Sequence, residues 1–378
     1  MKKAIINANV VLENGIIFDG VVLIENDRIL NVGTKDEISA EGYEIIDAQG
    51  AYVGPGFVDI HVHRGTKSGI DVTIEDTVEY FLAHGTTSFL PTLGYTFSFS
   101  ELLEKIKHIK EVAKHSSSIK GINMEGPYIN IKYGAGVFLL DGQPIPKKDE
   151  YAPIVAEGGE FIKIWTVAPE VEGIKDFMKD AKKANPGVVF SVGHSEATPE
   201  QIRALGVLKP RLQTHFGDAT GRVSVPKGIR GVGPDEYGLL EPEIYTEMIS
   251  DSCGIHVLPD MQRLLISVKG VSKVVLITDC TDSELPAPKE LEHIKDLNFD
   301  ERGGISGSRL TMNLACRNVM AHTNCGIAQA FVMASLNPAK VIGLDDEIGS
   351  IAVGKKADIV FVDDKFNVLR VIAEGKMI

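Results

Sequence analysis

The stretch Gly54-Pro55-Gly56-Phe57-Val58-Asp59-Ile60-His61-Val62-His63-Arg64-Gly65 predicts a buried strand between two breaks in regular structure. Side chains two residues apart in a strand lie on one face, so His61 and His63 project together. Two neighbouring imidazoles form half of a metal site. The break at Arg64-Gly65 places them at the carboxyl end of the strand, where α/β barrels keep their catalytic groups. A lone His-x-His pair also occurs in ordinary strands, so its meaning depends on the rest of the chain.

Apolar strand-like runs alternate with helical stretches after this strand, which is typical of βαβ units around a parallel sheet. About eight strand runs are present, at residues 56–63, 86–93, 121–125, 162–168, 188–194, 212–215, 254–258 and 274–279. Helical stretches are expected at 75–83, 100–114, 173–184, 200–205, 243–249 and 260–268, with a longer helical run at 310–336. Thr198-Pro199-Glu200-Gln201 forms a capping box, which predicts a helix start directly after the His194 loop.

We therefore predict an α/β fold, a (β/α)8 TIM-like barrel over residues 54–344, with a split doubly wound sheet as the alternative. The two ends of the chain have a different character. Asn-Gly and Asn-Asp turns separate β-branched runs near the N-terminus, and residues 357–364 and 368–374 are similar at the C-terminus. Residues 1–53 and 345–378 are expected to pair into one small β-sandwich subdomain.

Composition limits the function classes. The 378 residues are 44% hydrophobic and 24% charged, and the formal net charge of -13 argues against nucleic acid or anionic membranes as partners. No apolar run approaches the roughly 20 residues that span a bilayer, and no signal peptide is evident, so we expect a cytoplasmic protein. The cysteines include no C-x-x-C pair, so reduced core thiols are expected for the set Cys253, Cys280, Cys316 and Cys325.

Further metal-ligand residues fall at the predicted strand ends. Glu125 ends the third strand, His194 the fifth, His215 the sixth and Asp279 the eighth, and all would meet His61 and His63 at one mouth. Imidazole and carboxylate donors suit a divalent cation such as zinc, with iron as the alternative, and one or two ions are possible. A bound ion lowers the pKa of water towards about 7, and Asp279 would move the proton. Each residue also has a structural interpretation, such as a capped strand end or an exposed turn.

The motifs Gly56 to His63, Met124-Glu125-Gly126-Pro127, Gly193-His194-Ser195, Thr214-His215, Gly254-Ile255-His256-Val257 and Thr278-Asp279 resemble those of the amidohydrolase superfamily. More narrowly they resemble the N-acetylglucosamine-6-phosphate deacetylases, as do Gly307-Ser308-Arg309-Leu310-Thr311-Met312 and residues 349–358. The resemblance implies a metal-dependent amide hydrolase of amino sugar metabolism that acts as a homodimer. It implies that Glu125, His194 and His215 hold the main metal, and that His61 and His63 match residues that bind a second ion in some members. It also implies that Asp279 is the general base and acid, and that His256 and Ser308 contact substrate.

The sequence departs from this family in the segments that recognise substrate. A histidine that meets the acyl oxygen is usual after the Glu-Gly-Pro turn, whereas this chain reads Gly134-Ala135-Gly136-Val137. The family's Asn-Ala pair, whose amides help bind phosphate, is Asp218-Ala219 here, and a carboxylate at Asp218 repels a phosphate dianion unless a cation offsets it. Candidate cations in the same loop are Arg222, Lys227 and Arg230.

Deacetylation of an N-acetyl amino sugar phosphate is therefore the leading hypothesis. One alternative keeps the chemistry but changes the substrate to an N-acyl amino acid, cyclic amide or lactone, with Asp218 binding a positive group. A second alternative is a non-catalytic scaffold, which the retained histidines and carboxylates oppose.

Overall fold

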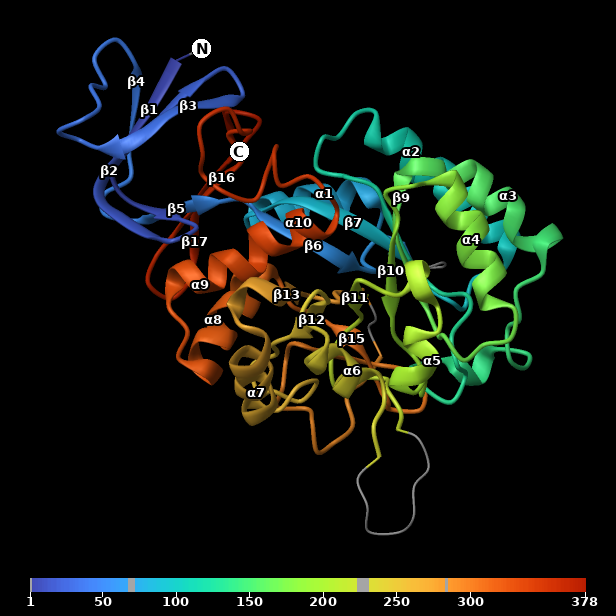
Figure 1. Ribbon diagram of the computed structural model, residues 1–378. Helices are drawn as coiled ribbons and strands as arrows, with labels where there is room; N and C mark the ends of the chain where they lie inside the picture. Colours follow the sequence, from blue (N-terminus) through green and yellow to red (C-terminus); the bar gives the residue numbers. More distant parts are fainter. Residues whose placement is uncertain (1, 67–71, 223–230, 283–284) are drawn as a thin grey trace.

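The computed structural model describes residues 2–66, 72–222, 231–282 and 285–378, and its centre is an eight-stranded parallel barrel (Figure 1). Each strand pairs with the next along the chain. The strands are β6 (Phe57–Val62), β7 (Thr86–Leu93), β8 (Ile122–Glu125), β9 (Ile162–Val167), β10 (Val189–Val192), β11 (Leu212–Gln213), β12 (Tyr245–Ile249) and β13 (Val274–Ile277). A parallel bridge between Val62 and Cys280 brings the last strand beside the first. The predicted TIM-like barrel is confirmed.

Helices cover the outside of the barrel between consecutive strands. They are α1 (Ile74–Ala83), α2 (Phe99–Ala113), α3 (Lys148–Gly158), α4 (Ile174–Ala184), α5 (Pro199–Arg203), α6 (Pro234–Leu240) and α7 (Pro259–Lys269). Short polar side chains start several of them. Thr198 accepts a hydrogen bond from the Gln201 N–H, so the capping box predicted before α5 is confirmed. The sequence patterns did not reveal α3 and α6.

The seventh strand was predicted in the wrong place. Residues 254–258, expected to be a strand, form a loop, and residues 243–249, expected to be a helix, contain β12. Glu247 caused this error, because a carboxylate inside a barrel strand gives the same sequence pattern as an exposed position on a helix. The 254–258 segment is a loop because Gly254 has a φ of +64° and Asp251 accepts hydrogen bonds from the N–H groups of Cys253, Ile255 and His256.

The helical run predicted at 310–336 is present but broken into pieces. It comprises α8 (Met312–Thr323), α9 (Ile327–Phe331), a π-helical turn (Val332–Leu336) and α10 (Asn337–Val341). Asn324 ends α8 in a left-handed conformation, and Pro338 stands near the start of α10. These helices pack on the barrel beside β6 and β13 (Figure 1).

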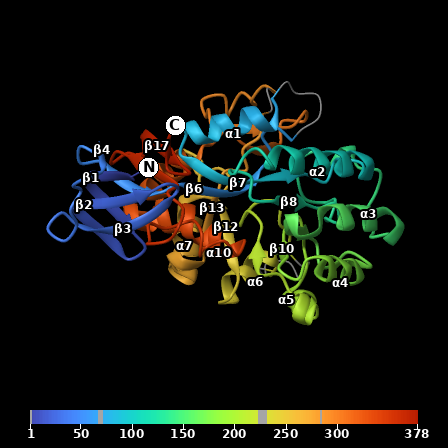
Figure 2. The same cartoon turned by 90° about the horizontal axis from the view of Figure 1, so that it is seen from above.

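Both chain ends build one mixed sheet beside the barrel, as Figure 2 shows from above. Its strands are β1 (Lys2–Leu12), β2 (Gly15–Glu25), β3 (Arg28–Thr34), β4 (Glu44–Asp47), β5 (Tyr52–Pro55), β16 (Ile359–Val362), β17 (Val368–Ala373) and β18 (Lys376–Met377). The N-terminal β1, β2 and β3 pair antiparallel, and C-terminal β16 pairs with β5. A separate two-stranded sheet joins β14 (Leu297–Phe299) to β15 (Ile305–Ser308).

The Gly-Pro-Gly sequence before β6 follows from close packing where this sheet meets the barrel. A Cβ atom on Gly54 would lie 2.4 Å from the Phe331 ring, and one on Gly56 would lie 2.2 Å from Thr87 Oγ1. Glycine therefore lets β5 run directly into β6 across this contact. Phe57 follows at once, fully buried and stacked 5.5 Å from Phe331, with Phe366 at 6.3 Å between ring centroids.

Among the residues described, the structure contains no helix that has both the length and the apolar character needed to cross a bilayer.

The Phe57 ring should be a major contributor to stability. Phe57→Ala leaves a cavity between barrel and sheet, and large buried aromatics cost about 3–5 kcal/mol when truncated to alanine. We expect a loss of that size in the free energy of unfolding, measured by urea denaturation. Phe18→Ala is the control, since Phe18 is 68% exposed. Equal midpoints for the two variants would contradict this account of the core.

Candidate metal centre

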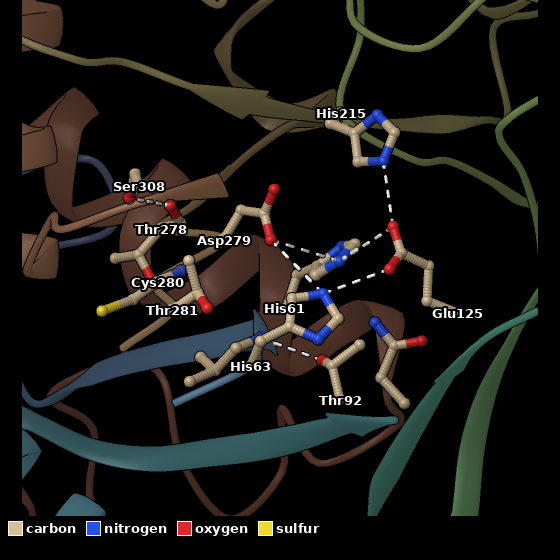
Figure 3. Close-up of polar contacts among 12 residues, drawn as sticks. His61, His63, Thr92, Glu125, His215, Thr278, Asp279, Cys280, Thr281 and Ser308 are labelled. Atoms are coloured by element: carbon tan, nitrogen blue, oxygen red, sulfur yellow. Dashed lines mark hydrogen bonds and ion pairs between the residues drawn. The ribbon is translucent and has the colours of Figure 1, made fainter. Parts of the chain in front are cut away.

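The carboxyl ends of five barrel strands bring the predicted metal residues together. All of them except His194 are labelled in Figure 3. His61 lies on β6, and Glu125 is the last residue of β8. His63, His194, His215 and Asp279 each follow closely after β6, β10, β11 and β13. Two compact groups result. The first group is His61, His63 and Asp279, and the second group is Glu125, His194 and His215.

Glu125 lies between the two groups and contacts both. Its Oε1 is 2.8 Å from His194 Nε2, 3.2 Å from His215 Nε2 and 3.5 Å from His61 Nε2. Its other oxygen, Oε2, is 3.1 Å from His63 Nε2. A single carboxylate therefore faces four imidazoles in a site where its own side chain is only 7% exposed.

Asp279 completes the first group. Its Oδ1 lies 3.4 Å from His63 Nε2 and 3.8 Å from His61 Nε2. The Asp279 backbone N–H donates to the His61 carbonyl oxygen, which fixes the end of β13 against β6. The carboxylate is thus held beside both histidines and across the mouth from Glu125 (Figure 3).

Three of these residues have a left-handed backbone. The φ angles are +47° at His194, +25° at His215 and +47° at Asp279. Such values are uncommon for residues other than glycine and tend to occur at functional sites. In each case the turn follows a barrel strand, so the chain bends as the side chain enters the mouth.

Three of the histidines are oriented by acceptors at Nδ1. His194 Nδ1 lies 3.1 Å from the Tyr133 carbonyl oxygen, and His215 Nδ1 lies 3.1 Å from that of Asp218. His61 Nδ1 lies 3.2 Å from the Glu247 carboxylate. An imidazole that donates from Nδ1 presents the lone pair of Nε2, which is the usual arrangement at metal sites. All three Nε2 atoms face the Glu125 carboxylate.

The donor set fits a divalent cation. Nitrogen and carboxylate oxygen are the donors that zinc and iron take, and each group offers three. His61 Nε2 is also buried without a hydrogen-bond partner among the described residues, which is costly for a polar atom unless something binds it. The site therefore contains two groups able to bind metal.

The electrostatics couple the histidines to the carboxylate. Burial raises the pKa of Glu125, but His194, His215 and His61 outweigh it and hold that pKa well below its usual range. Burial lowers the pKa of His215, yet its bond to Glu125 and the charge of Asp218 raise the net value to about 9. Without metal, a proton on the imidazoles takes the place of the cation.

The predicted substrate-binding residues have different surroundings. His256 is buried, and its Nδ1 lies 3.1 Å from Asp251. Within the part of the chain that the structure describes, its Nε2 has no hydrogen-bond partner. Asp218 and Ala219 follow His215 and are partly exposed. Ser308 lies behind the site, because its hydroxyl donates to the Thr278 carbonyl at 2.5 Å and its N–H donates to that of Asp279 at 2.8 Å.

The candidate cations of the strand 6 loop are only partly described. The Arg222 guanidinium lies 3.5 Å from the Glu236 carboxylate and is exposed. Lys227 and Arg230 lie outside the described residues.

Three polar residues at the site were missed by the sequence reasoning. Glu247 and Asp251 orient His61 and His256, and a correct position for the seventh strand would have indicated both. Tyr95 follows β7, its ring centroid lies 5.0 Å from that of His194, and its hydroxyl donates to the Ala135 carbonyl at 2.6 Å. No pattern in the sequence distinguishes Tyr95 from a core aromatic.

Comparisons with known proteins give one consistent answer. An amidohydrolase family profile matches residues 52–378. The N-acetylglucosamine-6-phosphate deacetylase of Haemophilus influenzae is 30% identical over 393 residues, covering 100% of this chain and 99% of that protein. The structure of the Pasteurella multocida N-acetylglucosamine-6-phosphate deacetylase matches with a TM-score of 0.86 at 25% identity, covering 100% of both chains. That of the Mycobacterium smegmatis enzyme in complex with N-acetyl-D-glucosamine-6-phosphate matches with a TM-score of 0.83 at 26% identity, covering 100% of this chain and 99% of that one.

Zinc loading of the metal-free protein at pH 7 should release at least one proton per chain. His215, with its pKa raised to about 9, is protonated at pH 7 and must lose that proton to become a ligand. Proton competition also means that zinc affinity rises with pH up to about pH 9. Calorimetric titration in two buffers of different ionisation enthalpy measures the release. Heats that do not depend on the buffer would contradict this description of the site.

Proposed function

Because the chain belongs to the amidohydrolase family, we propose that it is a metal-dependent deacetylase of an N-acetyl amino sugar phosphate. N-acetylglucosamine 6-phosphate is the first substrate to test, since the names of its full-length relatives give it. The observation that carries the proposal is a carboxylate, Asp279, held beside a cluster of four imidazoles and one further carboxylate at a barrel mouth.

We infer that the second group, Glu125 with His194 and His215, holds the main ion, with zinc favoured over iron by its nitrogen-rich donor set. His61 and His63, with Asp279, would hold a second ion. A bound divalent cation supplies Lewis acidity, which lowers the pKa of water and stabilises charge on the acyl oxygen.

Asp279 is proposed to move the proton. Its carboxylate accepts a proton from the attacking water as the oxygen bonds to the acyl carbon. It then donates that proton to the amine nitrogen as the carbon–nitrogen bond breaks, which yields acetate and a free amino sugar phosphate. The hydrogen bond from the Asp279 N–H to the His61 carbonyl supports this role, because it fixes the backbone from which the carboxylate projects.

His256 is proposed to bind the sugar. Its Nε2 is buried and has no hydrogen-bond partner in the described ranges, so a substrate hydroxyl can satisfy it. Burial lowers the pKa of His256, but the bond to Asp251 and the charge of Asp218 raise it overall, which favours the imidazole as a donor. We also propose that Ala219, Arg222 and Arg230 contact the substrate's phosphate from the strand 6 loop. Ser308 is proposed to position Asp279, because its N–H donates to the Asp279 carbonyl.

Asp218 favours one alternative substrate class. Its carboxylate lies near enough to affect both His215 and His256, and negative charge there opposes a phosphate dianion. An N-acyl compound with a positive group is therefore the second candidate, and the chemistry at Asp279 is unchanged. The scaffold alternative is opposed by the intact donor set.

The assembly and the cellular location stay predictions. We propose a cytoplasmic homodimer, the dimer being what the family resemblance implies. All four cysteines are free thiols, which suits a reducing compartment, although Cys253 is exposed and not in the core as expected. Light scattering of the purified protein measures the assembly.

Asp279→Asn should lower acetate release from N-acetylglucosamine 6-phosphate by about 10²- to 10⁴-fold, the range for loss of a general acid–base. The assay uses zinc-reconstituted protein, and zinc content is measured in parallel, because the amide also removes a ligand charge. Asp282→Asn is the control: Asp282 lies in the same segment, and its Oδ2 accepts the Gly65 N–H, which an amide oxygen also accepts. Near wild-type turnover by Asp279→Asn with zinc bound would exclude the mechanism.

Asp218→Asn separates the two substrate classes. If the substrate carries phosphate, removing this negative charge should raise kcat/KM for the phosphorylated compound by about tenfold, or about 1.4 kcal/mol, and change kcat/KM for unphosphorylated N-acetylglucosamine by much less. High salt should reduce the difference. A fall in kcat/KM for the phosphorylated compound would instead mean that Asp218 helps to bind substrate, which favours the cationic class.

A further inference from the structure

A buried carboxylate lies directly beneath the metal ligands. Glu247 is the central residue of β12, it is 1% exposed, and its side chain enters the barrel. Its Oε2 lies 3.2 Å from His61 Nδ1 and accepts the His215 backbone N–H at 3.2 Å. Burial of a carboxylate is costly, and these contacts offset that cost.

The histidines of the two groups differ in the acceptor that faces Nδ1. In the second group, His194 and His215 direct Nδ1 at backbone carbonyls, which are neutral acceptors. In the first group, His61 directs Nδ1 at a full negative charge. A carboxylate partner raises the basicity of a ligating imidazole more than a carbonyl does. His61 should therefore be a stronger imidazole donor than His194 or His215.

The position of His61 Nε2 supports the same role for His61 as a metal ligand. With Nδ1 directed at Glu247, the lone pair of Nε2 faces the mouth, where Nε2 is buried without a hydrogen bond to any residue that the structure describes. The carboxylate oxygens of Glu125 and Asp279 lie 3.5 Å and 3.8 Å away. A cation among these three atoms would satisfy all of them.

We propose that Glu247 is a positioning residue that sets the affinity of the first group, His61, His63 and Asp279, for a second metal ion. It orients the His61 ring so that Nε2 points toward the ion, and its negative charge raises the basicity of Nε2. The proposal rests on the proposed function for the presence of metal, but not on the identity of the substrate.

The test is a zinc titration of metal-free protein against a chromophoric chelator, without substrate. Wild-type protein should bind two ions per chain. Glu247→Gln keeps the shape and an acceptor oxygen but removes the charge, so it should weaken one binding event by about tenfold and change the other by less than about threefold. The control is Asp358→Asn, which neutralises a similarly buried carboxylate far along the chain in the terminal sheet region.

A double-mutant cycle tests whether Glu247 affects metal binding through His61. His61→Asn should abolish the same binding event that Glu247→Gln weakens, and the double variant should match His61→Asn alone, because Glu247 acts through His61. One ion per chain in wild-type protein, equal affinities in wild type and Glu247→Gln, or a further loss in the double variant would each overturn the proposal.

Nitrogen NMR of the zinc-loaded wild-type protein keeps the proposal falsifiable if Glu247→Gln does not fold. Histidine labelling should show His61 protonated at Nδ1 and zinc-bound at Nε2, and the reverse pattern would overturn the proposal. Neither measurement uses substrate, so a failed deacetylase assay leaves the result on Glu247 interpretable, and the converse also holds.

Discussion

The centre depends on one electrostatic constraint, the burial of the Glu125 carboxylate among four imidazoles. An isolated buried carboxylate would be protonated, because burial disfavours its charged form. Contacts to His194, His215 and His61 outweigh the burial and hold the pKa of Glu125 well below its usual range. Positive charge at this point, as protons or as metal, is therefore a condition for the native arrangement of the barrel mouth.

The barrel supplies that arrangement because its closure and its site share residues. The hydrogen bond from the Asp279 N–H to the His61 carbonyl joins the last strand to the first, and the Val62–Cys280 bridge lies next to it. The left-handed backbone at His194 and Asp279 makes the polypeptide turn where it leaves β10 and β13. The fold thus stores local strain at the residues that carry the chemistry, and packing of the barrel offsets it.

The sequence predicted the barrel and the meeting of its candidate metal-binding residues, because both follow from local rules. The period of two put His61 and His63 on one face, and the strand-end rule brought them to Glu125. Prediction from the sequence failed where a site residue does not fit the pattern of its own segment. Glu247 made a buried strand resemble a helix, and Tyr95 approaches His194 only through tertiary packing. The roles of the substrate residues stay predictions, because they depend on loops whose shape no periodicity encodes.

The most direct test is anomalous diffraction at the zinc edge from crystals of zinc-loaded protein. We expect two peaks about 3.5–4 Å apart, one at each group, with Glu125 between them. The peak beside His61 and His63 should be the weaker when zinc is limiting. Zinc absent from both groups, or bound only elsewhere on the surface, would contradict the central claim that these strand ends form a metal centre.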